Sequence, residues 1–287
     1  MIAVFRKELR SFYTNMTGII FAAFLLLVSG IFTVAVNLRS GYPNFEYMLS
    51  STYFIYMIIV PILTMRSFSD ERHRKTDQLL YSLPLKIRDV VAGKYLAMVT
   101  VLAAPTLLLA LIPPILSIYG TVNFAAAYGT LFAFFLMGCA LIAIGMFFSS
   151  LTESQIIAAV LSFSALLVCY LAKGISGLIP STPIASFIAL SVLAAVAAIA
   201  AYMLTKDTTV GGSVYIVLQL LLALLYFNKS SIFENLFPTV IASLGVFDRL
   251  DSFVGGIFDL SAVVYYLTVI CLFCYLTAKT MQQRRWA

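Results

Sequence analysis

Long apolar runs alternate with short polar stretches along this chain. Eight of the runs reach or approach the roughly 20 residues that an α-helix needs to cross a hydrocarbon core of about 30 Å. Backbone groups in lipid must form their hydrogen bonds within their own segment, so each run is expected to be helical. The pattern predicts an all-α, polytopic integral membrane helical bundle. The predicted spans cover residues 17–36, 49–65, 95–118, 124–148, 154–171, 184–204, 213–227 and 260–277.

The seventh of these runs is the weakest, because it is short and carries the polar residue Gln219. The alternative interpretation is therefore six spans together with a re-entrant helix pair. Both span counts are even, which places the two termini on the same side of the membrane. We treat residues 1–287 as a single transmembrane domain.

The basic residues of the loops predict which side of the membrane holds the two termini. Lys and Arg accumulate in cytoplasmic loops, and a cytoplasmic amino terminus places 14 of them inside and 4 outside. We therefore expect both termini in the cytoplasm. The outer set is Arg39, Lys173, Lys229 and Arg249.

Composition excludes the soluble classes of protein. The chain is 62% hydrophobic and 10% charged, with a mean hydropathy of +1.02, whereas soluble domains carry about 25% charged residues. Its net charge of +6 indicates basic loops beside anionic lipid. A nucleic-acid partner is not expected, since no basic face is interleaved with aromatic residues.

The first 16 residues have the pattern of an amphipathic helix. Apolar residues recur at spacings of three and four, and basic residues stand between them. This pattern predicts an elbow helix that lies in the inner membrane interface and leads into the first span. The alternative is a basic tail that only sets orientation. The residues that define the elbow are Phe5, Arg6, Lys7, Leu9 and Arg10.

One sustained polar stretch interrupts the apolar runs, at residues 66–94. It holds seven of the eighteen Lys and Arg residues and the only His. A chain this apolar gathers so many charges only where they meet water and a partner. We therefore expect a functional cytoplasmic loop here.

Within this loop, Ser69 is a candidate helix cap, followed by the acids Asp70 and Glu71. Exposed N–H groups and the helix dipole favour such residues at a helix start. The helix is predicted to run to Pro84, which ends it by withholding an N–H. A second helical part at 87–93 then leads into the third span, and together they form a helical lever.

These residues resemble the first cytoplasmic loop of type-2 ABC transporter permeases, in particular the gliding-motility permease branch. The family pattern often has Gly immediately before the threonine that corresponds to Thr76. This chain has Lys75 there, a residue that favours an unbroken helix. The resemblance implies a coupling helix that docks on a separate ATP-binding subunit. The implied docking residues are Glu71, Arg72, Thr76, Leu79, Leu80 and Pro84, followed by the pair Gly93 and Lys94.

The resemblance continues in FRKELRSF, in SLTESQIIAAVLSF and in residues 247–286, while 180–227 fits least because two spans are inserted there. It implies extracellular amphipathic helices at 228–259 that cover the translocation path; a loop resting on lipid headgroups is the alternative. We expect Gly255 and Gly256 to form a bend and Asp259 to cap the final span. The implied gate residues are Phe247, Asp248, Gly255, Gly256 and Asp259.

The chain lacks the residues that other transport and enzyme mechanisms need. No Asp, Glu, Lys, Arg or His stands in the middle of a predicted span, as an ion-coupled carrier would require. Gly93 and Lys94 are followed by Tyr95 rather than Ser or Thr, so there is no phosphate loop. Cys271 and Cys274 have metal spacing but lie in an apolar span, where cysteine packs as a small hydrophobe. No metal or cofactor is expected on this chain.

Three classes of function remain compatible with a chain of this kind. The sequence favours the membrane-spanning permease subunit of an ATP-driven ABC exporter, with ATP and Mg on the partner chain. The alternatives are a stand-alone secondary carrier or channel, and an intramembrane enzyme, which would need a convergent catalytic cluster. The resemblance implies a second permease subunit, identical or related, in a bacterial plasma membrane. The substrate is expected to be hydrophobic or amphiphilic and is not identified.

Overall fold

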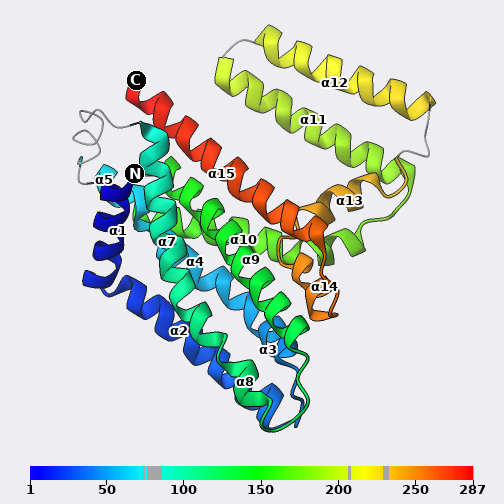
Figure 1. Cartoon of the computed structure of the whole chain (residues 1–287). Coiled ribbons are helices and arrows are strands. Elements are labelled where there is room, and N and C mark those ends of the chain that lie inside the picture. Colours follow the sequence, from blue (N-terminus) through cyan, green and yellow to red (C-terminus); the bar gives the residue numbers. More distant parts are fainter. Residues whose placement is uncertain (74, 76–85, 206–207, 229–232, 287) are drawn as a thin grey trace. The chain divides into compact units, whose positions relative to one another are not determined.

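The computed structural model describes residues 1–73, 75, 86–205, 208–228 and 233–286. Every regular element in these residues is helical, as predicted from the apolar runs (Figure 1). The helices are α1 (Ile2–Thr14), α2 (Thr17–Phe32), η1 (Thr33–Leu38), α3 (Phe45–Thr52), η2 (Tyr53–Ile55), α4 (Tyr56–Thr64), α5 (Arg66–His73), α7 (Ile87–Leu109), α8 (Ile112–Leu116), α9 (Phe124–Leu151), α10 (Gln155–Leu178), α11 (Pro183–Thr205), α12 (Thr208–Asn228), α13 (Leu236–Ser243), η4 (Asp248–Leu250), α14 (Asp251–Val254) and α15 (Leu260–Trp286).

Six helical segments in the described part of the chain are long and apolar enough to cross a membrane. The sixth and seventh predicted spans coincide with α11 and α12, but their described apolar parts, Pro183–Val192 and Tyr215–Leu224, are shorter. Whether these two helices cross the bilayer stays a prediction. The six segments are Thr17–Leu38, Phe45–His73, Ile87–Leu116, Phe124–Leu151, Gln155–Leu178 and Leu260–Gln283.

The chain divides into two compact units, Met1–Tyr170 with Val246–Ala287, and Leu171–Gly245. In the first unit α9 is the central helix and the most buried of the six candidate spans. It packs against α3, α4, α5, α7 and α15 (Figure 1). A helix with neighbours on several sides is expected to be apolar on most of its surface, which agrees with the sequence of α9.

Two glycines of α9 let neighbouring helices approach closely. A methyl group at Gly145 would lie 3.0 Å from the Cβ of Thr64 in α4. At Gly138 it would lie 2.7 Å from a side-chain methyl of Leu102 in α7. Helix packing in membranes relies on such small residues, because apolar side chains gain little by leaving lipid for one another.

The second candidate span continues past its predicted end, and this overturns the predicted helix start in the polar loop. Helices α3, η2, α4 and α5 follow one another from Phe45 to His73, so the chain enters the loop already helical. Ser69 is not a cap: its hydroxyl donates to the Met65 carbonyl one turn earlier. Asp70 and Glu71 lie in the last turns of α5. The prediction failed because no helix N-terminus exists here for these residues to stabilise.

The second unit is built from α11, α12 and α13, together with the end of α10. Helix α11 packs along α12 and also contacts α13. The amide of Gln219 donates to the hydroxyl of Ser191 over 3.2 Å, so the polar residue that weakened the seventh predicted span has a partner on α11. The rings of Phe187 and Tyr226 lie 5.0 Å apart.

The predicted outer pair at 228–259 is divided between the two units after Gly245. In the first unit, η4 and α14 are held to α9 by the Thr130 hydroxyl, which donates to the Phe253 carbonyl over 2.9 Å. Gly256 has a φ of +77°, the left-handed conformation expected at a glycine bend. The carboxylate of Asp259 accepts from the Ser261 N–H over 2.8 Å and caps α15.

Candidate functional site

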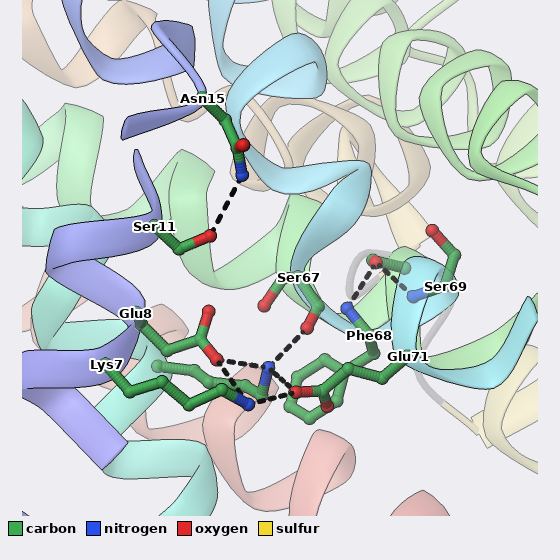
Figure 2. A network of polar contacts seen from close by, with 10 residues as sticks. Lys7, Glu8, Ser11, Asn15, Ser67, Phe68, Ser69 and Glu71 are labelled. Atoms are coloured by element: carbon green, nitrogen blue, oxygen red, sulfur yellow. Dashed lines mark hydrogen bonds and ion pairs between the residues drawn. The ribbon is translucent and has the colours of Figure 1, made fainter. Parts of the chain in front are cut away.

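A buried lysine joins three helices at the end of the first unit that holds the amino terminus. The Lys94 side chain is 2% exposed, and its Nζ lies 3.0 Å from an oxygen of Glu8 and 3.0 Å from an oxygen of Glu71. The same nitrogen donates to the Ser67 carbonyl over 2.7 Å. It also lies 5.1 Å from the centre of the Phe68 ring. We call Lys7, Glu8, Glu71 and Lys94 the ionic joint (Figure 2).

The fourth member of the ionic joint is the solvent-facing Lys7. Its Nζ lies 3.4 Å from Glu71 and 3.9 Å from Glu8, and its side chain is 67% exposed. Two cations therefore meet two carboxylates, and the charges within the joint balance. A buried charge is tolerated only when it is paired and hydrogen-bonded, which is the arrangement around Lys94.

The elements of the joint come from three distant parts of the sequence. Helix α1 supplies Lys7 and Glu8, α5 supplies Glu71, and α7 supplies Lys94. Next to the lysine, Gly93 allows α1 to lie close on α7, because a methyl group there would be 3.1 Å from the Met1 carbonyl oxygen. Gly93 thus allows the close approach of α1 to α7, and the ion pair of Lys94 with Glu8 stabilises it.

The elbow helix α1 packs against the rest of the first unit through its apolar face. Phe5 and Leu9 are half-buried and Phe12 is buried, whereas Arg6 and Arg10 are exposed. The α1 helix packs on α7 and α2. The predicted helical pattern is present, and its placement in the membrane interface stays a prediction.

Helix α5 is also fixed to α9 by a serine. The Ser149 hydroxyl donates to the Met65 carbonyl over 3.0 Å. The same oxygen accepts from the Phe68 N–H over 3.1 Å and from the Ser69 N–H over 3.3 Å. The Ser149 side chain therefore bonds to the backbone at the junction of α4 and α5. These bonds hold α5, which leads into the loop, against the central helix α9.

A polar cavity of about 400 Å³ opens beside the ionic joint. Its walls include Arg66 and Asp70 of α5 and the start of α10, where the Gln155 amide donates to Asp70 over 2.8 Å. Among the described residues, no group of three His, Cys, Asp or Glu side chains is placed to hold a metal ion. The arrangement is suited to holding α1, α5 and α7 in a fixed relation to one another.

The structure turns the two described docking candidates of the loop inward. Glu71 belongs to the ionic joint, and Arg72 is 6% exposed. The Arg72 guanidinium donates to the sulfur of Met281 over 3.6 Å, which places the end of α15 beside α5. Thr76, Leu79, Leu80 and Pro84 lie outside the described residues. Docking through these six residues stays a prediction.

The implied gate residues lie near the start of α9, whereas the ionic joint lies near its end. Phe247 is 1% exposed, and its ring lies 5.7 Å from that of Tyr53 and 5.5 Å from that of Tyr170. Asp248 begins the short helix η4. This segment is packed onto the spans rather than lying loosely over them, and its role as a gate stays a prediction.

The expectation that Lys75 continues the helix is wrong. Helix α5 ends at His73, and Lys75 has a φ of 55°, in the left-handed region. Its N–H donates to the Arg72 carbonyl over 2.9 Å, as at a helix end. A residue with a Cβ is strained in this conformation, which glycine adopts without strain.

Replacing Lys75 with Gly is therefore expected to stabilise the loop base by about 1 kcal/mol, because glycine adopts a positive φ without strain. The measurement is the thermal unfolding midpoint of the purified protein. Lys86→Gly is the matched control, since Lys86 has a φ of −74° and glycine relieves no backbone strain there. A lower midpoint for Lys75→Gly than for the unaltered protein contradicts this explanation.

Sequence reasoning missed Glu8, Ser67 and Ser149 as parts of this site. Glu8 is the single acid among the first 16 residues, and that isolation was the one available signal. Ser67 takes part through its backbone carbonyl, which every residue type carries. Ser149 stands in an apolar run, where a serine attracts no notice.

One comparison with known proteins gave a match. The model of a family described as "ABC-2 family transporter protein" matches residues 2–282, nearly the whole chain. No curated protein matches the chain. The match includes all three helices of the ionic joint and also the α11–α12 region that the sequence patterns fitted least.

Proposed function

Because the chain belongs to the ABC-2 family of transporter proteins, we propose that it is the permease of an ATP-driven exporter. It is a multi-pass membrane subunit, and this family depends on a separate ATP-binding subunit. Two permease chains, identical or related, assemble with two such subunits in a bacterial plasma membrane. ATP and Mg bind to those subunits. Within the family, the loop residues favour the gliding-motility branch.

The ionic joint is the observation that supports coupling through the loop. In the sequence, the end of α5 and the start of α7 flank the loop residues 74–85. Glu71 before the loop and Lys94 after it are paired, and Glu8 ties both to the elbow helix. A push on the loop therefore reaches α1, α5 and α7 together. ATP-driven closure of the partner subunits moves these helices as one group.

We further propose that the substrate is hydrophobic or amphiphilic and leaves outward, past the segment from Phe247 to Asp259. The described spans offer apolar surfaces, and charged groups gather at their ends. An apolar path suits a substrate that enters sideways from the inner leaflet. Direction and chemical class are tested with the assembled complex in vesicles.

The docking proposal is tested by placing charge at its apolar centre. The double variant Leu79→Asp and Leu80→Asp is expected to abolish co-purification of the ATP-binding subunit and to lower ATP hydrolysis in membranes at least tenfold. The physical reason is that a buried, unpaired carboxylate costs several kcal/mol at an apolar contact.

The matched control places the same charges at Ile118 and Tyr119, an adjacent apolar pair that is 78% and 75% exposed after α8. This control is expected to assemble and hydrolyse ATP as the unaltered protein does. Equal assembly of both double variants would reject docking through the loop. Loss in both would show that the added charge damages folding, and the docking proposal would lose its support.

A further inference from the structure

An apolar groove of about 490 Å³ lies between α7 and α15 in the first unit. Each helix contributes five residues to its lining. On α7 the groove begins at Arg88 and reaches Ala92 and Leu96; on α15 it runs past Ala278, Cys274 and Ile270. The ionic joint uses none of these residues, so the groove is a separate feature of the fold.

The spacing of the lining residues gives the groove its length. On both helices they recur at intervals of three and four over nine residues, the period of a single helix face. At 1.5 Å per residue, each face is about 12 Å long. One leaflet of a hydrocarbon core is roughly 15 Å thick, so the groove extends through most of one leaflet.

The charge on the lining is confined to one end. Arg88 is exposed in the first turn of α7, and it is the single charged residue among the ten that line the groove. The rest are apolar, aromatic or cysteine residues, and Leu96 remains 39% exposed. Lys279 is also exposed, one residue beyond Ala278 at the same end. An apolar slot with a cation at its mouth complements a chain with an anionic head.

We propose that this groove binds an anionic phospholipid, with one acyl chain between α7 and α15 and the phosphate paired with Arg88. The planar guanidinium of arginine pairs with phosphate through two parallel hydrogen bonds. The acyl chain covers apolar surface that the two helices leave open. The leaflet is the one beside the loop, which is the inner leaflet in the proposed orientation. The site does not depend on what the transporter moves.

The test is lipid retention by the purified chain, measured by native mass spectrometry without ATP. Phosphatidylglycerol is expected to bind at least tenfold more tightly than phosphatidylcholine with the same acyl chains. Both lipids carry the phosphate, but the choline cation of phosphatidylcholine neutralises it and is repelled by Arg88 and Lys279. Arg88→Gln is expected to reduce that preference to about onefold. Lys86→Gln removes a charge two residues away on another face of the helix and is expected to keep the preference.

A second variant tests the apolar part of the site. Ala92→Phe fills the groove and is expected to lower retention of both lipids at least tenfold. Labelling of the exposed Cys271 by a lipophilic maleimide is expected to slow when phosphatidylglycerol is added, with Cys271→Ser as the blank.

Four results would overturn the proposal. They are equal binding of the two lipids, unchanged preference in Arg88→Gln, competition by inorganic phosphate at the concentration of the lipid, and retention in Ala92→Phe. Crosslinks between the Cys271 residues of two chains would assign the groove to a second copy instead. If Arg88→Gln does not fold, the two lipids and the Cys271 labelling still decide the question in the unaltered protein.

Discussion

Replacing Lys94 with Met is expected to destabilise the protein by about 3 kcal/mol, as when one partner of a buried ion pair is removed. Glu8 and Glu71 would keep their negative charges in a site that is 13% and 16% exposed, without the cation that lies 3.0 Å from each. The Ser67 carbonyl would also lose its donor. The measurement is unfolding of the purified protein in detergent. In the assembled complex, ATP hydrolysis is expected to persist while transport per ATP falls.

Two further variants separate the charge from the loss of a long side chain. Lys86→Met removes an exposed lysine at the start of the same helix and is expected to leave stability within about 0.5 kcal/mol. Glu71→Gln in the Lys94→Met background removes one of the two stranded charges and is expected to restore part of the loss. No restoration, or an equal effect of Lys86→Met, would show that the ionic joint does not hold the helices.

Replacing Gly145 with Ala is expected to destabilise the protein by about 2 kcal/mol through overpacking between α9 and α4. The added methyl group would lie 3.0 Å from the Cβ and 3.1 Å from the Cγ2 of Thr64. Thr64 is fully buried, and its hydroxyl donates to the Val60 carbonyl over 3.0 Å. A β-branched side chain has few alternative rotamers, so α4 must move away from α9 instead.

Gly129→Ala is the matched control on the same helix. Apart from the adjoining backbone of α9, no atom lies within 4 Å of a methyl group at Gly129, so the change meets open space. Alanine is favoured over glycine in a helix by about 1 kcal/mol, and the control is expected to unfold at a slightly higher temperature. Thermal unfolding of the two variants under the same conditions is the measurement. Equal midpoints would contradict the close contact of α9 with α4.

The spans were predictable from sequence because hydropathy is a local property. Each of the six long apolar segments coincides with a predicted span, with ends displaced by up to eight residues. The displacement is largest at the end of the second span, which continues to His73, and at the start of the third, which begins at Ile87. Polar residues such as Ser69 and Asp70 resembled a helix start, yet a helix that is already formed continues through such residues at little cost.

The cap at Asp259 and the bend at Gly256 were also predictable, since both depend on residues adjacent in the chain. The strained conformation of Lys75 was not. Its side chain favours a helix, yet α5 ends two residues earlier and its backbone is left-handed. The nearby contact of Arg72 with Met281 was equally hidden, since it joins residues more than 200 positions apart.

By itself, the sequence determined an all-helical membrane chain with an amphipathic first helix and one charged loop, because these follow from periodicity and composition. Only the tertiary structure decided that Lys94 is buried, that Glu8 is its partner, and that Arg88 stands at the mouth of an apolar groove. The physical reason is that the sequence gives the identity of a charged residue but does not show whether its side chain faces water or another helix. Burial and pairing depend on which helices lie side by side.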